Sequence, residues 1–98
     1  MSRRFSIRAS LTGARYVLRL RGELDGSTAC LVLQAMERAP GRAREVVVDL
    51  AEVTELEPFG VDVLSRGARA YGRGRPVRIV ATEQSGDARS PGSRQGAE

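Results

Sequence analysis

Residues 46–60 read VVVDLAEVTELEPFG, and the predicted fold is organised around this stretch. The β-branched run at 46–48, followed by Leu50, is typical of an internal parallel strand that is covered on both faces. Beyond the stretch, apolar residues recur at spacings of three, four and three, at Val61, Leu64, Ala68 and Tyr71. This period predicts an amphipathic helix. We therefore expect a short strand, a solvated connecting loop and then the helix.

The residues before this stretch predict a hairpin. Near the N-terminus, apolar residues alternate with polar ones, at Phe5, Ile7, Ala9 and Leu11. A period of two indicates a half-buried strand. Gly13 lies in a turn-forming sequence and is free to adopt a positive φ. Residues 16–21 form a second strand that Gly22 ends, so the two strands should pair antiparallel.

A helix is predicted between this hairpin and the strand at 46–50. Ser27 or Thr28 is expected to cap it, and it should run to about Arg38. Its apolar positions include Leu31, Leu33, Ala35 and Met36. The dipeptide Pro40-Gly41 then stops it.

The order of predicted elements specifies the fold class. Residues 77–80 form a last strand, which gives strand, strand, helix, strand, helix, strand. This order implies a small α/β fold, an open mixed sheet of about four strands with two right-handed crossover helices. We expect the domain to span residues 1–82. Residues 83–98 contain only two apolar side chains and are predicted to be a disordered tail.

The composition excludes several classes of function. The 98 residues include no His and one Cys, which argues against ordinary zinc sites, internal disulfides and His-based catalysis. No apolar run approaches the roughly 18 residues that cross a bilayer, and the N-terminus lacks the apolar segment of a signal peptide. We therefore expect a cytoplasmic protein without membrane insertion.

The formal net charge of +4 is unevenly distributed. All 16 basic residues are Arg, and residues 1–22 carry Arg but no acid. Residues 23–62, by contrast, are predominantly acidic. A nucleic-acid-binding protein concentrates positive charge on the element that meets phosphate. Because the most patterned part of this chain is acidic, we expect no direct binding to nucleic acid.

Two features suggest chemistry but have simpler explanations. The glycines at 67, 72 and 74 follow a helix, whereas a phosphate-binding loop joins a strand to a helix, so we interpret them as a helix end and a loop. Cys30 has no His partner and is expected to be a small core or half-buried residue.

A third feature is the density of acids around the second predicted helix start, at Glu52, Glu55, Glu57 and Asp62. A pair of carboxylates could transfer protons or bind a hard cation. No nucleophile or calcium-loop glycine accompanies these acids, so we favour a recognition surface or a solvated loop. We predict no catalytic residue, metal site or cofactor.

Two segments carry the strongest functional signal. Residues 22–25, GELD, follow the second predicted strand, and residues 48–60 follow the third. Open α/β sheets place binding sites at such carboxyl ends of strands. Together, over residues 5 to about 81, these segments resemble the STAS domain (sulfate transporter and anti-sigma factor antagonist). The bacterial cytoplasmic anti-anti-sigma factors are the most similar type.

The resemblance implies a non-catalytic regulator of transcription. Such proteins bind an anti-sigma factor, usually a serine kinase with a GHKL-type fold, and so release a sigma factor. The kinase inactivates them by phosphorylating a serine in an Asp-Ser-Ser-Gly motif at the second helix start. The added phosphate carries about −1.5 to −2 charges at a surface that must pack against the partner.

This sequence departs from the family at that motif. Aligned on Gly60, the family's Asp-Ser-Ser becomes Glu57-Pro58-Phe59, so no hydroxyl is present for phosphorylation. Pro is favoured in the first turn of a helix, and Glu57 keeps an acid near the helix N-terminus. The ring of Phe59 is either an outward interface anchor or an inward core residue. The nearby hydroxyls of Thr54 and Ser65 do not match the family position.

The predicted docking surface combines two clusters of residues, Asp25, Ser27 and Thr28 with Glu57, Pro58, Phe59, Gly60 and Asp62. We expect the family's C-terminal helix to be shortened or missing here, because residues 83–98 have no apolar stripe. We therefore expect self-association as a homodimer to cover the exposed apolar surface. Two alternatives remain open, a STAS subunit of a transporter ATPase complex and a domain that binds a small ligand or nucleotide.

Overall fold

The computed structural model describes residues 5–81. The elements are β1 (Ser6–Thr12), β2 (Arg15–Leu24), α1 (Gly26–Glu37), β3 (Glu45–Leu56), α2 (Pro58–Tyr71) and β4 (Val77–Val80). Their order is the predicted one. The predicted tail at 83–98 and the predicted absence of a C-terminal helix concern residues outside this range.

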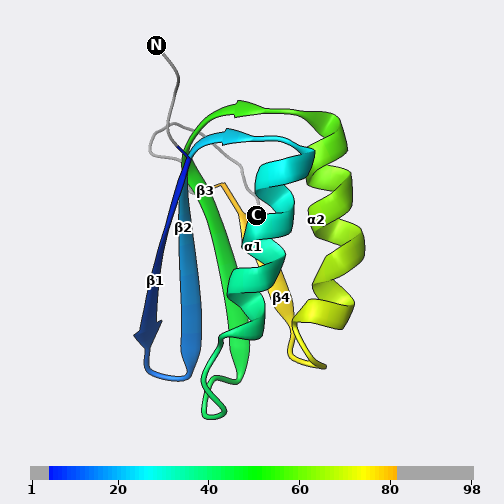
Figure 1. Cartoon of the computed structure of the whole chain (residues 1–98). Helices are drawn as coiled ribbons and strands as arrows, with labels where there is room; N and C mark the ends of the chain where they lie inside the picture. The colour runs from blue at the N-terminus through cyan, green and yellow to red at the C-terminus, as the bar shows by residue number, and fades with distance from the viewer. Residues whose placement is uncertain (1–4, 82–98) are drawn as a thin grey trace, which may run out of the picture.

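The strands form one mixed sheet in the order β1-β2-β3-β4. β1 pairs antiparallel with β2, while β2 with β3 and β3 with β4 are parallel. Figure 1 shows both helices in front of the sheet, with each crossover moving one strand to the right. Both crossovers are therefore right-handed, and the predicted open mixed α/β sheet is confirmed.

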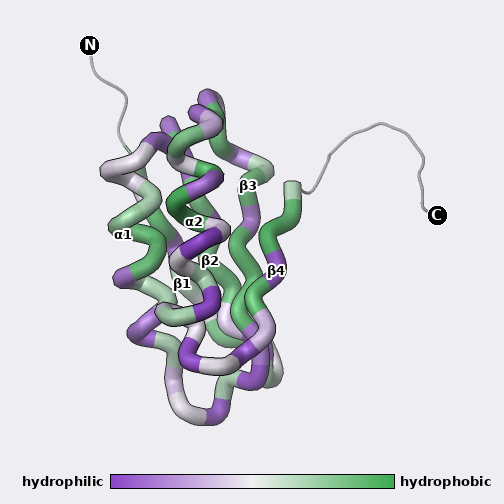
Figure 2. Tube along the Cα trace, turned by 90° about the vertical axis from the view of Figure 1, so that its right-hand side faces the viewer, coloured by the Kyte–Doolittle hydropathy of each residue, from purple (hydrophilic) through white to green (hydrophobic). Residues whose placement is uncertain are grey.

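The hydrophobic core lies between the sheet and the helices. Alternate residues of β2 and β3 face the helices, including Leu18, Leu20, Val46 and Val48. α1 buries one stripe against them, made of Ala29, Val32, Leu33 and Met36. α2 adds Leu64, which is fully buried. Figure 2 shows this two-layer arrangement edge-on, with hydrophobic residues recurring along the strands and helices.

The other face of the sheet has no helix over it in the part of the chain that the structure describes (Figure 1). The prediction that the third strand is covered by layers on both faces was therefore wrong. Val47 is nevertheless only 9% exposed, because Val17 and Arg78 flank it on the neighbouring strands. Side chains within the sheet, not a second layer of helices, shield it.

Both central strands are longer than the sequence predicts. Gly22 does not end β2 but lies within it, paired with Val53 at a φ of 108°. The register shifts on either side of this pair, which identifies an irregularity in the ladder that a glycine accommodates. The predicted loop after residue 50 is the second half of β3, held against the end of β2.

Two further details of α1 differ from expectation. Cys30 is exposed, because the buried stripe of the helix passes through the adjacent Ala29 and turns Cys30 toward solvent. Leu31, predicted among the apolar positions, is also 48% exposed. Cys30 and Leu31 are small or apolar residues, but the sequence does not specify which side of the helix meets the sheet.

The glycines of α2 have structural roles. Gly72 is the C-cap residue of α2, as predicted for this cluster. Gly67 lies against α1, and a β-carbon there would lie 2.5 Å from Leu33 Cδ1. The two helices therefore approach each other closely at Gly67.

Arg75 connects the loop after α1 with the loop after α2 through hydrogen bonds. Its Nε donates to the carbonyl of Ala43 at 2.8 Å, and its Nη2 donates to the carbonyl of Pro40 at 3.0 Å. One partly buried side chain therefore links the loop after α1 to the loop after α2.

Candidate functional site

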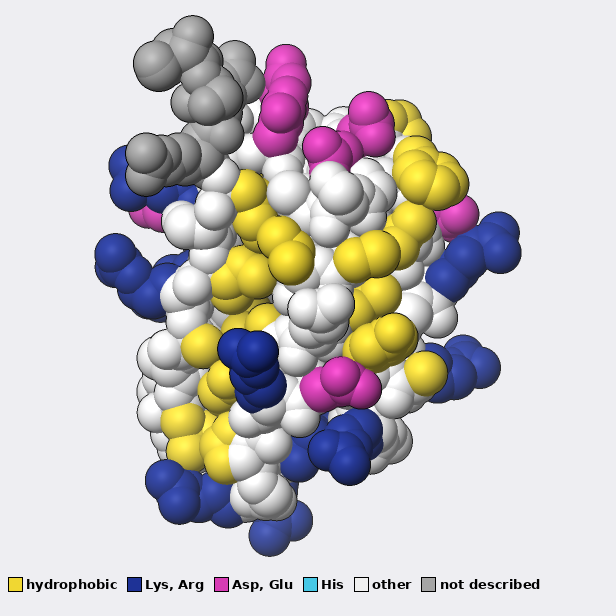
Figure 3. Space-filling model, viewed as in Figure 1, with side chains coloured by type: hydrophobic (Ala, Val, Ile, Leu, Met, Phe, Trp, Pro, Cys, Tyr) yellow, Lys and Arg dark blue, Asp and Glu magenta, His cyan; other side chains and the backbone are white. Residues whose placement is uncertain are grey.

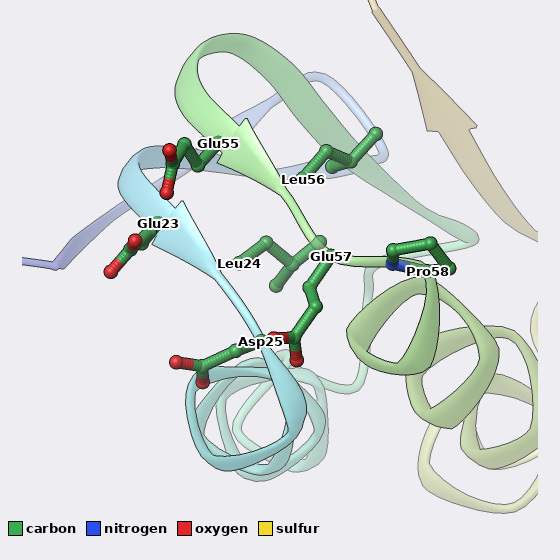
Figure 4. Close-up of a pocket in the computed structure, with 7 residues that line it drawn as sticks. All are labelled: Glu23, Leu24, Asp25, Glu55, Leu56, Glu57 and Pro58. Carbon is green, nitrogen blue, oxygen red and sulfur yellow. The ribbon is translucent and has the colours of Figure 1, made fainter.

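The carboxyl ends of β2 and β3 lie side by side and lead directly into the two helices. Leu24 pairs with Leu56, and the amide of Glu57 donates to the carbonyl of Leu24 at 2.9 Å. A hollow of about 350 Å³ lies at this edge, lined by Glu23, Leu24, Asp25, Glu55, Leu56, Glu57 and Pro58 (Figure 4). We call this end of the molecule the apex. It brings together the two predicted segments.

The start of α1 is held by a capping box centred on Asp25. The Asp25 Oδ1 accepts from the amide of Thr28 at 2.9 Å, and the Thr28 hydroxyl accepts from the amide of Asp25 at 2.8 Å. The N-cap is therefore Asp25, and the prediction of Ser27 or Thr28 as the cap was wrong. Two helix-end donors are satisfied reciprocally by this pair, which favours Asp25 as the cap.

The hydroxyls of the first turn are engaged locally. Thr28 also donates to the carbonyl of Glu23 at 2.9 Å, which fastens α1 to the end of β2. Ser27 is exposed and donates to Asp25 Oδ1 at 2.9 Å. The backbone amide of Thr28, and then the Ser27 hydroxyl, hold the pKa of the Asp25 carboxyl below its usual value of 3.8. Asp25 is therefore an ionised structural cap and not a proton donor near neutral pH.

The start of α2 is built differently. Glu57 is in the N-cap position with φ −84° and ψ 130°, but its side chain makes no capping hydrogen bond. Pro58 follows in the first turn, where its missing N–H costs little. In Figure 4 the Glu57 side chain extends from this turn toward the beginning of α1. The acid is thus placed near both helix N-termini, where a negative charge is favourable.

The structure decides between the two orientations of Phe59. Its side chain is 64% exposed, and Leu56, three residues earlier in the chain, is 51% exposed. The inner edge of the ring rests on Gly26 at the start of α1, where a β-carbon would lie 2.8 Å from Phe59 Cε2. The ring therefore points outward, with one edge packed against Gly26.

The remaining predicted site residues lie around this ring. Gly60 is buried, and a β-carbon there would lie 2.7 Å from the backbone of Asp25, so it sets the closeness of the helices and presents no surface. Asp62 is exposed and pairs with Arg66 at 3.0 Å one turn along α2. Thr54 and Ser65 are exposed hydroxyls on β3 and α2.

Several residues that build the apex were not predicted as site residues. Glu23 and Leu24 lie within the quoted GELD segment and Leu56 within the segment 48–60, so their positions at strand ends were the available signal. Gly26 carried no comparable signal, because its role depends on the contact between α1 and α2. Figure 3 shows acidic and hydrophobic side chains side by side at the top of the molecule.

Two further observations concern residues 5–81. No group of three or more metal-ligating side chains there is arranged to hold a metal ion. None of the helices in this range is both long enough and apolar enough to cross a membrane. The apex combines carboxylates with an exposed ring and an exposed leucine, which suits binding of another molecule.

Solved structures share this fold. A crystal structure of Mglu matches with a TM-score of 0.65 and 27% identity, over 79% of this chain and 20% of that chain. This chain therefore spans only about a fifth of the Mglu chain. An anti-sigma factor antagonist from Mycobacterium paratuberculosis matches with a TM-score of 0.65 and 22% identity, over 82% of this chain and 69% of that chain.

A third structure is the antisigma-factor antagonist STAS domain from Rhodobacter sphaeroides. It matches with a TM-score of 0.59 and 22% identity, over 78% of this chain and 85% of that chain. No curated protein sequence matches this chain. The family model described as "Mlab, STAS domain" matches residues 7–87. With that match and the shared fold, the chain belongs to the STAS domain family.

Proposed function

We propose that this chain is a non-catalytic, cytoplasmic protein-binding module that docks a partner protein through the apex. The observation that carries the proposal is the exposure of Leu56 and Phe59, which come directly before and after Glu57 and Pro58 in the chain. Large exposed apolar side chains rimmed by polar groups mark protein-binding surfaces. Both lie where open α/β sheets place their binding sites.

The ring of Phe59 suits the role of an anchor. Aromatic side chains contribute disproportionately to binding energy when they enter a pocket on the partner. One edge of this ring already lies against Gly26, so part of its surface is positioned before the partner docks. The carboxylates of Glu55 and Glu57 then favour a partner with complementary positive charge.

The chemistry of the apex supports a binding role over a catalytic one. Asp25 is used as a helix cap with a lowered pKa, whereas a general acid needs a raised one. Cys30 is exposed on α1, and the chain contains no His that could activate it. The thiol of Cys30 therefore has no imidazole base in this chain.

The leading partner is an anti-sigma factor of the serine-kinase type, whose capture would release a sigma factor. Structural neighbours described as anti-sigma factor antagonists support this choice. Because Pro58 occupies the family's phosphorylation position, binding would not be switched off by phosphate there. This chain would then act as an antagonist without the usual covalent control.

A second candidate is the STAS subunit of a transporter ATPase complex. The observation that favours it is the matching family model, whose description names Mlab and not an anti-sigma factor antagonist. Both candidates use a protein partner at the same surface. They differ in which partner binds.

The test measures binding of the purified chain to each partner class by calorimetry. The partners are a kinase-type anti-sigma factor and a STAS-associated transporter ATPase from the same genome. We expect one of them to bind, and Phe59→Ala to weaken that binding by about 1–3 kcal/mol. Cys30→Ala is the control, because Cys30 is exposed on α1 and lines neither the apex hollow nor the hollow between β1 and α1.

The outcomes separate the candidates. Binding only to the ATPase replaces the leading candidate with the second. Binding that Cys30→Ala and Phe59→Ala weaken equally contradicts docking through the apex. Turnover of any substrate by the purified chain contradicts the non-catalytic proposal.

Self-association is proposed as a separate property. A hollow of about 350 Å³ between β1 and α1 has apolar walls that include Phe5, Ile7, Tyr16 and Leu31. Covering it with a second copy would remove apolar surface from water. Light scattering at tens of micromolar should show a dimer, and a purely monomeric species contradicts this expectation.

A further inference from the structure

The face of the sheet opposite the helices is rich in arginine. Side chains alternate along a strand, so the residues between the core positions share this face. They include five arginines, Arg8, Arg15, Arg19, Arg21 and Arg78. The acids on this face are Glu23, Glu45, Asp49, Glu52 and Glu55. Glu23 and Glu55 are opposite each other near the ends of β2 and β3, whereas the arginines extend over β1, β2 and β4.

The arginines on this face are not equally paired. Arg15 and Arg78 both reach Glu45, at 3.2 and 3.6 Å. Arg19 lies 3.6 Å from Asp49. Within residues 5–81, neither Arg8 nor Arg21 has an ion pair with any acid. The unpaired charge is therefore concentrated at one end of β1 and β2.

The unpaired arginines converge on one hollow. Arg8 is directly opposite Arg19 in the β1–β2 ladder, and Ser6 is directly opposite Arg21. These four residues, together with Glu52, line a hollow of about 210 Å³. Like charges that face each other across two strands destabilise the pairing. A bound anion between the guanidinium groups would relieve this repulsion.

We propose that this hollow binds a phosphate group, either as a free phosphate or as the headgroup of a phospholipid. Guanidinium groups present paired N–H donors that match phosphate oxygens in bidentate geometry. Arg8, Arg19 and Arg21 supply these donors, and the Ser6 hydroxyl supplies one more. The site is on the opposite face of the sheet from the helices and does not depend on the proposed partner-binding function.

Within residues 5–81, Glu52 is the one acidic residue that lines this hollow. It is directly opposite Arg21 in the β2–β3 ladder. It would therefore compete with phosphate for the arginines and repel the incoming anion. Glu52→Gln removes this competing charge while keeping the size of the side chain.

The first experiment uses the full chain and inorganic phosphate, measured by calorimetry in low-salt buffer with chloride as the reference anion. We expect saturable binding of phosphate. Arg8→Gln/Arg21→Gln should weaken it at least tenfold, on the order of the loss of one charge-assisted hydrogen bond. Glu52→Gln should tighten it. Circular dichroism shows that each variant is folded.

Arg69→Gln is the matched control. Arg69 is an exposed arginine in the last turn of α2, on the other side of the molecule, and its substitution removes one of the two charges that the double variant removes. We expect it to leave phosphate binding unchanged. A loss per charge as large in Arg69→Gln as in the double variant would show that the effect is only net charge and would overturn the site. Absence of saturable binding by the native chain would also overturn it.

A second experiment distinguishes the two sources of phosphate. Vesicles of phosphatidylglycerol and of phosphatidylcholine are sedimented with the native chain and with the double arginine variant. Binding to phosphatidylglycerol that the double variant loses supports a headgroup ligand. Binding of inorganic phosphate without binding to vesicles supports a free phosphate. Vesicle binding that the double variant retains contradicts a role for this hollow in lipid binding.

Discussion

The ring of Phe59 at the start of α2 rests on Gly26 at the start of α1, with no room for a β-carbon between them. The exposed ring of the apex is thus positioned by a residue on the other helix. Gly60 next to it contacts the backbone of Asp25 just as closely. The orientation of the ring and the spacing of the helix N-termini therefore depend on the same two glycines.

Gly26→Ala should therefore alter binding more than stability. Its new β-carbon would meet only the ring, which is exposed and free to turn aside. We expect the free energy of unfolding to change by about 0.5 kcal/mol or less, while partner affinity falls several-fold. Urea denaturation and calorimetry measure the two effects. Gly41→Ala is the control, because a β-carbon at Gly41 meets nothing within 4 Å.

Gly67→Ala should lower stability through the contact between the helices. Overpacking against Leu33 costs about 1–3 kcal/mol, and the better helix propensity of alanine offsets up to about 1 kcal/mol. Leu33→Ala alone creates a cavity that costs about 2–5 kcal/mol. The double variant should be more stable than the sum of the single effects predicts. Leu33→Ala removes the atoms that the new methyl group at residue 67 would meet, and that methyl group fills part of the cavity. Strict additivity would show that Gly67 and Leu33 do not interact.

Pro58→Ser should restore a site for phosphorylation. In the presence of ATP and a kinase-type anti-sigma factor that binds the native chain, we expect mass spectrometry to find phosphate at residue 58 of this variant only. Binding should then weaken, because phosphate adds charge at the docking surface. Pro58→Ala controls for the change of backbone. Phosphate on native Thr54 or Ser65 would contradict the proposed loss of covalent control.

The stability contributed by Asp25 should depend on pH. Its pKa is lowered by folding, so the contribution is present above pH 3.8 and is lost as the pH falls through the lower folded value. Asp25→Asn cannot titrate at this position. We expect the difference in unfolding free energy between the native chain and Asp25→Asn to shrink as the pH falls below 3.8. A difference that does not change with pH would show that the carboxylate is not responsible.

Arg75→Ala should destabilise the loops at the base of the molecule. It removes two charge-assisted hydrogen bonds to carbonyls, so we expect the free energy of unfolding to fall by about 2 kcal/mol. Urea denaturation measures the change. Arg69→Ala removes an equal charge from an exposed helix position and should change stability little. Equal losses in the two variants would attribute the effect to net charge.

Much of the fold could be predicted from periodicity alone. The alternation at 5–11 and the spacing from Val61 to Tyr71 are local patterns, and both elements formed where expected. Gly22 misled the prediction because a glycine that ends a strand and a glycine within an irregular ladder are identical in sequence. Only its pairing with Val53 distinguishes them.

The position of the apex could be predicted from the sequence, but its helix cap and the direction of its exposed ring could not. The strand-end segments GELD and 48–60 indicated where it lies, since topology brings such ends together. The cap residue was uncertain because Asp25, Ser27 and Thr28 all suit that position. The direction of Phe59 depends on Gly26, a contact between segments far apart in the sequence, and no local pattern encodes it.

β3 continues to Leu56, whereas β4 pairs with it only from Val46 to Asp49. Within residues 5–81, the upper half of β3 therefore has a strand neighbour on one side only, and the apex depends on the β2 ladder for its hydrogen bonds. Amide exchange in this half should proceed through local opening at lower free energy than in the four-stranded base. A docked partner would then slow amide exchange at the apex more than in the rest of the sheet, and the protected amides would show which residues it contacts.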